Sequence, residues 1–177
     1  MRDISQTLSA HELSRAKILI IGLSESLRSS LVDSFCSLNC HFISSDTAYR
    51  AEAEKKTPLG TVCQRSLDQD IPIPDETVLA IWRRWFWSSK IRKSFVLEGF
   101  PSTIIQARVL DEWLETREQT IDFVFCMDAP KMSEGANFPQ KALSDHYRNQ
   151  GVLVEFVSTE TLITFLQEKS VKLPFAS

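Results

Sequence analysis

The segment 22–30 is where residue types and spacing first suggest chemistry in this sequence. Gly22 ends an apolar run, and the polar residues that follow are Ser24, Ser26, Arg28, Ser29 and Ser30. A turn between a buried strand and a helix presents backbone N–H groups and the positive end of the helix dipole, which together bind phosphate. Taken alone the segment is a weak phosphate-loop motif, because it keeps Gly22 and the basic Arg28 but has Leu27 where a second glycine is expected.

The strands and helices that would position this turn are visible as alternating patterns in the sequence. Short apolar runs typical of buried strands lie at 18–21, 41–44, 94–98, 121–127 and 152–157. Helical spacing fills the intervals, including a stretch that Asp75 would cap and that runs through Trp87. The alternation predicts an α/β fold of three layers around a parallel, doubly wound sheet. With 177 residues, we expect one domain at 17–177 after a polar tail at 1–16.

Composition excludes several classes of protein. The 20 basic and 23 acidic residues form no long block of one sign, so we expect no nucleic-acid partner. Four cysteines without a CxxC pair, and three scattered histidines, spell out neither a zinc site nor a disulfide framework. The longest apolar run, 18–23, is far below the roughly 20 residues of a membrane span. We therefore expect no membrane partner and a cytoplasmic, reduced protein.

Four segments carry a family resemblance. LEGFPSTIIQA at 97–107 resembles the LDGFPRTxxQA signature of adenylate kinases, which is quite specific. Three others match without gaps by eye: ISSDTAYR at 43–50 resembles ISTGDMLR, TPLG at 57–60 resembles [ST]xLG, and LDQDIPIPDE at 67–76 resembles MDxGxLVPDE. The resemblance covers about 17–130. It implies the P-loop nucleoside monophosphate kinase fold, with a five-stranded parallel sheet in the order 2-3-1-4-5 and an acceptor-side insertion at about 44–75.

The resemblance also implies site residues. Arg28 takes the place of the loop lysine, Glu98 that of the aspartate that orients magnesium waters, and Ser30 that of the hydroxyl on magnesium. The nucleoside monophosphate side would comprise Ser45, Arg50, Ile73, Gly99 and Gln106. Among these, Arg50 would contact the AMP phosphate and Gln106 the adenine edge, and the implied ligands are magnesium with ATP, ADP or AMP. Other interpretations stay open, since Glu98 is equally a strand-end carboxylate and Ser29 and Ser30 are equally helix-start residues.

Other positions depart from the family pattern. Glu25 and Leu27 replace glycines of the family's GxPGxGKGT loop. A carboxylate about 5 Å from a phosphate would oppose binding by about 3 kcal/mol at an effective dielectric near 20, or roughly a hundredfold in affinity. Ser102 replaces the arginine of GFPRT, and the lid, reduced to about 129–140, lacks the family's paired arginines. Loss of such arginines alone would lower the rate of phosphoryl transfer by about 10³- to 10⁵-fold.

Three functions remain compatible with these residues. The first is a pseudoenzyme that binds a nucleotide weakly or not at all. The second is a slow but genuine adenylate kinase in which Arg28, Arg50 and Glu98 carry binding. The third is an interaction or regulatory module that contacts a protein partner through the N-terminal tail or the Trp82–Trp87 helix, although helical spacing there favours Trp82, Trp85 and Phe86 as core residues.

Overall fold

A five-stranded, entirely parallel sheet forms the centre of the protein. The computed structural model describes residues 8–23, 27–88, 94–127 and 138–171. The strands are β1 (Lys17–Ile21), β2 (Phe42–Ser44), β3 (Phe95–Glu98), β4 (Phe123–Met127) and β5 (Leu153–Phe156). Their order in the sheet is β2-β3-β1-β4-β5, so both the predicted class and the predicted strand order are confirmed.

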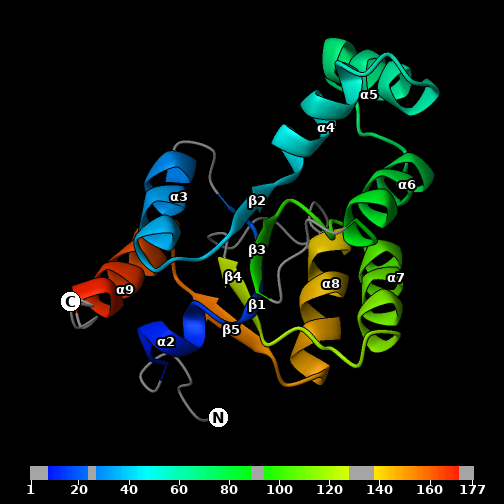
Figure 1. The fold of residues 1–177 in the computed structure, drawn as a ribbon. Coiled ribbons are helices and arrows are strands. Elements are labelled where there is room, and N and C mark those ends of the chain that lie inside the picture. The colour runs from blue at the N-terminus through cyan, green and yellow to red at the C-terminus, as the bar shows by residue number, and fades with distance from the viewer. Residues whose placement is uncertain (1–7, 24–26, 89–93, 128–137, 172–177) are drawn as a thin grey trace.

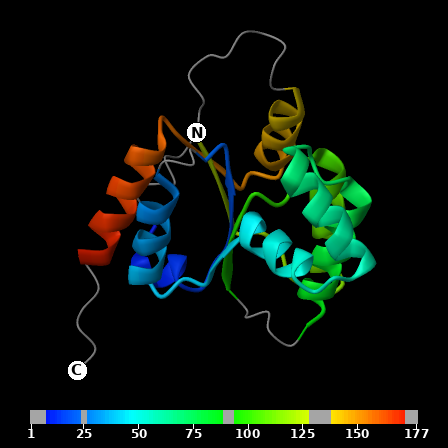
Figure 2. The ribbon, with the colours of Figure 1, turned by 90° about the horizontal axis from the view of Figure 1, so that it is seen from above.

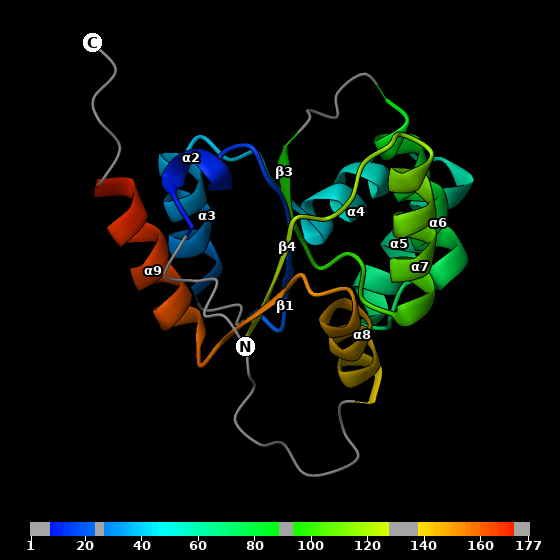
Figure 3. The same ribbon diagram turned by 90° about the horizontal axis from the view of Figure 1, so that it is seen from below.

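Helices cover both faces of this sheet, as Figures 2 and 3 show. One face carries α2 (Ala10–Leu13), α3 (Arg28–Ser37) and α9 (Thr159–Val171). The other carries α6 (Asp75–Phe86), α7 (Ile104–Glu115) and α8 (Phe138–Asn149). A further pair, α4 (Ser45–Ala53) and α5 (Pro58–Gln69), extends from the end of β2 away from the sheet (Figure 1).

The α4–α5 pair is held close by Gly60. A Cβ atom at this position would lie 2.4 Å from the carbonyl oxygen of Glu52, so only glycine allows the two helices this approach. Thr57 caps α5 by accepting a hydrogen bond from the Gly60 N–H, at 3.0 Å. The TPLG segment therefore has a packing reason for its threonine and its glycine.

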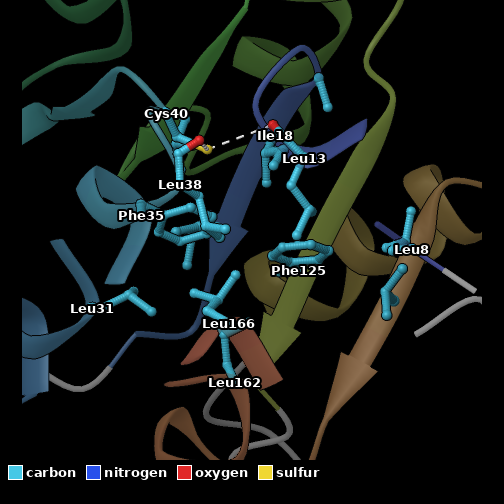
Figure 4. Close-up of a cluster of buried hydrophobic side chains, with 14 of the residues drawn as sticks. Leu8, Leu13, Ile18, Leu31, Phe35, Leu38, Cys40, Phe125, Leu162 and Leu166 are labelled. Carbon is cyan, nitrogen blue, oxygen red and sulfur yellow. Dashed lines mark hydrogen bonds between the residues drawn. The ribbon is translucent and has the colours of Figure 1, made fainter. Parts of the chain in front are cut away.

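The core on the α3–α9 face includes part of the predicted polar tail. Leu8 and Leu13 are buried beside Phe35 and Phe125 (Figure 4), and Ser9 forms a reciprocal capping box with Glu12 at the start of α2. Cys40 donates from Sγ to the carbonyl oxygen of Leu13 at 3.5 Å, and burial raises the pKa of this thiol to about 12. Within residues 8–16, Ala10–Leu13 thus form a short helix, and Leu8 and Leu13 pack in this core.

The core on the other face is built around the aromatic helix α6. Trp82 is 1% exposed and stacks on Phe100 with ring centroids 4.7 Å apart, and Phe86 is 2% exposed. Trp85 is partly buried against the same cluster, which confirms the predicted core role of these three residues. Trp87 is 49% exposed, and Arg117 covers its ring at 4.8 Å.

The start of α6 differs from the sequence expectation, whereas α7 begins after one of the two residues, Ser102 and Thr103, that the sequence offers as its N-cap. The prediction that Asp75 caps α6 is wrong: Pro74 occupies the N-cap and Asp75 is the first helical residue. Proline is already fixed near the required φ, which leaves the Asp75 carboxylate available for side-chain contacts. At α7, Thr103 rather than Ser102 is the N-cap and accepts a hydrogen bond from the Gln106 N–H at 3.2 Å.

Candidate functional site

The carboxyl edge of the sheet brings several predicted site residues together. Parallel register places Ser44 level with Glu98, and Glu98 level with Ile20. The residues that directly follow β1, β2 and β3 are therefore neighbours at one edge, namely Gly22, Ser45 and Gly99. In open parallel sheets this edge is where ligands bind.

Arg28 and Glu98 form an ion pair at this edge. Arg28 is the first residue of α3, and its Nη2 lies 3.2 Å from Oε1 of Glu98. The second carboxylate oxygen, Oε2, accepts a hydrogen bond from the Ser44 hydroxyl at 2.9 Å. The side chain of Glu98 is 7% exposed and that of Arg28 is 31% exposed, so the pair is shielded mainly on the carboxylate side. The two residues predicted to be catalytic are thus bonded directly to each other.

Glycine is required at two positions of this edge. Gly22 has a φ of +77° and Gly99 a φ of +78°, a region that side chains other than glycine rarely adopt. A Cβ at Gly22 would also lie 2.9 Å from the Met127 carbonyl oxygen, and one at Gly99 would lie 2.0 Å from Oγ of Ser45. Ser45 and Gly99, both predicted on the acceptor side, are therefore in direct contact.

Gln106 is the centre of a hydrogen-bond network. It is 1% exposed, and its side-chain oxygen accepts from the Ser102 N–H at 2.8 Å and from the Ser102 hydroxyl at 3.1 Å. Its amide nitrogen donates to Asp75 at 2.7 Å, and the same carboxylate accepts from Thr103 at 3.2 Å. The network ties the start of α7 to the start of α6 and occupies both ends of the amide.

Arg50 lies apart from this cluster. Its side chain is 64% exposed, and Nε bonds both carboxylate oxygens of Asp46, at 2.9 and 3.1 Å. This hydrogen bond and the charge of Asp46 raise the pKa of the Arg50 guanidinium. Ile73, the remaining acceptor-side residue, is partly buried against the apolar clusters of α4, α5 and α6.

Of the predicted loop hydroxyls, the structure describes only Ser29 and Ser30. Both are exposed in the first turn of α3, and the Ser30 carbonyl accepts from the Ser34 hydroxyl at 2.8 Å. Ser24, Ser26 and Glu25 lie outside the described residues, as does most of the expected lid at about 129–140.

The described donor set does not fit magnesium well. Glu98 uses one oxygen for Arg28 and the other for Ser44, and the guanidinium sets a positive charge beside the carboxylate that would hold the ion. Within the described ranges, no group of three or more histidine, cysteine, aspartate and glutamate residues is arranged to hold a metal. The expectation that Ser30 binds magnesium therefore stays a prediction.

Sequence reasoning missed a buried carboxylate on α4. Glu52, with a side chain 3% exposed, accepts from Lys55 Nζ at 2.7 Å, from Arg84 Nη1 at 2.9 Å and from the Thr57 hydroxyl at 3.0 Å. Burial acts to raise the pKa of Glu52, but the hydrogen bonds from Lys55 and Thr57 and the nearby positive charges outweigh it and lower the pKa overall. The spacing of Glu52 and Lys55 was visible in the sequence, whereas the contact with Arg84 depends on the packing of α4 on α6.

The sheet order, the helices on both faces and the glycine turn after β1 define the fold of the P-loop nucleoside monophosphate kinases. A family model described as adenylate kinase matches residues 29–135, which is more than half of the chain. The chain belongs to the adenylate kinase family.

Individual relatives show the same likeness over part of their length. The chain is 36% identical over 94 residues to an adenylate kinase of Streptomyces lividans, which covers 53% of this chain and 46% of that protein. It is 34% identical over 89 residues to an adenylate kinase of Clostridium kluyveri, which covers 50% of this chain and 41% of that protein. The match thus spans less than half the length of these relatives.

Among the described residues, no helix is both long enough and apolar enough to cross a membrane.

Proposed function

We propose that this protein is an adenylate-kinase-like nucleotide-binding protein with weak or absent phosphotransfer. The observation that supports this most is the ion pair between Arg28 and Glu98. A phosphate that approaches Arg28 must compete with a carboxylate already bonded to it, and it must do so next to a buried negative charge. The pair would therefore disfavour both the phosphate and the metal that phosphoryl transfer requires.

The acceptor side supports binding better than it supports catalysis. Arg50 is exposed and bonded to Asp46, and solvent screens this pair. An incoming phosphate could therefore take the place of the Asp46 carboxylate on Arg50. Gln106 would have to exchange its bonds to Asp75 and Ser102 to contact a base. We therefore expect a weak acceptor-side interaction centred on Arg50. The α4–α5 pair, at about 44–75, would be the acceptor-side insertion of one domain.

Turnover is the direct test of this proposal. Purified protein with ATP, AMP and magnesium should produce ADP no faster than the same preparation of an Arg28→Met variant. Both preparations would be followed in a coupled assay, so that a contaminating kinase appears equally in the two. Robust ADP formation that disappears in Arg28→Met would show a genuine kinase and would overturn the proposal.

A second test separates the two roles open to Glu98. If Glu98 competes with phosphate for Arg28, then Glu98→Gln should raise the affinity for ATP about three- to tenfold, with or without magnesium, because one negative charge is removed. Asp122→Asn is the matched control, since Asp122 lies at the opposite end of the sheet beside Lys17. If Glu98→Gln instead lowers ATP affinity only when magnesium is present, Glu98 serves the metal and the proposal is wrong.

A further inference from the structure

A cavity of about 700 Å³ lies beside β2, between α3 on one side and α4 and α6 on the other. Its apolar lining includes Val32, Phe42, Ala48, Ala51, Ile81 and Trp85. One end reaches Arg28 and Ser44, but the predicted acceptor residues Arg50, Gly99 and Gln106 do not line it. The cavity is therefore a different place from the acceptor side considered above.

The cavity runs along the open edge of the sheet. β2 is the outermost strand and pairs with β3 alone in the described sheet. The His41 carbonyl accepts from the Val96 N–H at 2.8 Å, and the parallel ladder continues through Ile43, so the peptide groups of His41 and Ile43 that face β3 are in use. By the alternation of a parallel pair, the N–H and C=O of Phe42 face the open edge. This edge can accept another strand.

The polar wall of the cavity has more hydrogen-bond donors than it uses. Glu52 has both oxygens bonded, and Asp46 has both oxygens bonded to Arg50. Lys55 and Arg84 each give one described hydrogen bond, to Glu52, and each side chain is 55% exposed. An ammonium carries three donors and a guanidinium five, so donors directed at an anion remain after both carboxylates are satisfied.

We propose that this cavity binds an extended acidic peptide segment of a partner protein. The segment would add a strand beside β2 through the peptide groups of Phe42. Because side chains alternate along a strand, apolar residues would pack on Trp85 and Ile81 while carboxylates reach Lys55 and Arg84. A peptide fits better than a nucleic acid because the strand edge offers backbone hydrogen bonds.

The probe is a pool of N-acetylated, C-amidated hexapeptides in which glutamate alternates with valine, leucine or phenylalanine. Titrated into ¹⁵N-labelled protein, the pool should shift the amide signals of 42–44 and the indole N–H signal of Trp85. A pool with lysine in place of glutamate should shift none of them. Equal shifts from both pools, or shifts only at other residues, would overturn the proposal.

Two variants test the location. Ala51 is exposed and lines the cavity, so Ala51→Glu places bulk there and a negative charge one helical turn before Lys55, and it should weaken binding about tenfold. Ile105→Glu adds the same charge at a 58% exposed position of α7 outside the cavity and should leave binding unchanged. Equal affinities in the two variants would contradict the assignment.

Strand pairing has its own test. Peptides N-methylated at alternate residues should lose binding in one of the two registers, because only every second N–H faces β2. Unchanged binding in both registers would exclude strand addition by a peptide.

Discussion

Two segments that resemble the same family, 97–107 and 22–30, differ in how far they keep the family pattern and in what their residues contact. At 97–107 the glycine and glutamine of the signature are kept, and each has a structural role, since Gly99 makes room for Ser45 and Gln106 joins α6 to α7. At 22–30 Gly22 is kept, but Leu27 replaces a glycine, and Arg28 is bonded to Glu98. Residues of a family signature can thus have packing roles while the neighbouring loop departs from the family pattern.

The largest expected effect tests the packing side of this contrast. Gly99→Ala should destabilise the protein by about 3 kcal/mol or more, because it combines an unfavourable φ with a clash against Ser45. Gly151→Ala is the matched control: its φ is +76°, but nothing lies within 4 Å of the new Cβ, so a loss of roughly 1 kcal/mol is expected. Urea unfolding measures both, and equal losses would show that the Ser45 contact is unimportant.

A smaller effect is expected at Gln106. Gln106→Leu removes a side-chain amide that is 1% exposed and leaves the partly buried Asp75 carboxylate and the Ser102 N–H without this partner, which should cost about 1 to 2 kcal/mol. Gln64→Leu provides the comparison, since Gln64 also donates to an aspartate, Asp68, but at an exposed site where changes stay within about 0.5 kcal/mol. If Gln106→Leu proved equally mild, the glutamine would be retained for a reason other than packing.

The stability of the α4–α5 pair is expected to depend on pH through Glu52. The folded-state pKa of Glu52 is lowered, so its contribution to stability is present above the unfolded pKa of about 4.3 and is lost as the pH falls through the folded value. The protein should therefore lose stability below about pH 4.3, and Glu52→Gln should flatten that part of the profile. Melting temperatures between pH 7 and pH 3 give the measurement, with Asp46→Asn, in a partly exposed ion pair, as control. Parallel profiles for Glu52→Gln and the parent would refute this role.

The smallest effect on stability is expected on the phosphate side. Glu98→Gln should change the unfolding free energy by less than about 1 kcal/mol, because Arg28 is partly exposed and the amide oxygen can still accept a hydrogen bond. Urea unfolding of Glu98→Gln and Gly99→Ala, measured side by side, compares the two kinds of residue at this edge of the sheet. A small loss of unfolding free energy for Glu98→Gln would mean that its ion pair matters mainly for ligands. A loss as large as that of Gly99→Ala would show that the ion pair also holds the fold together.

Much of the fold was predictable because its signals are local. Buried strands such as 18–21 are continuous apolar runs, and their alternation with helices fixes a parallel sheet. The strand order followed from the family resemblance. The helix at α2 was missed although its capping box, Ser9 to Glu12, was present in the sequence, because four residues are too few for a clear helical period.

The site was predictable only in part because it depends on which partner each polar group finds. The resemblance correctly brought Arg28 and Glu98 to one edge, but the sequence could not tell that they bond to each other. Likewise the hydrogen bond from Gln106 to Asp75 joins residues 31 positions apart, and the Glu52 to Arg84 contact joins residues 32 apart. Such pairings are decided by helix packing, which no local pattern encodes.

The contacts of α4 with α6 have a mechanical consequence. Trp82 donates from its indole to the Tyr49 hydroxyl at 3.3 Å, and Arg84 donates to Glu52 at 2.9 Å. The two attachments sit about one helical turn apart on α4, so together they resist rotation as well as separation. If the α4–α5 pair rotates relative to the sheet, α6 must therefore move with it as one rigid body, or both hydrogen bonds must break. Since α6 is anchored by Trp82 stacked on Phe100, such a rotation would be transmitted to the loop that follows Gly99.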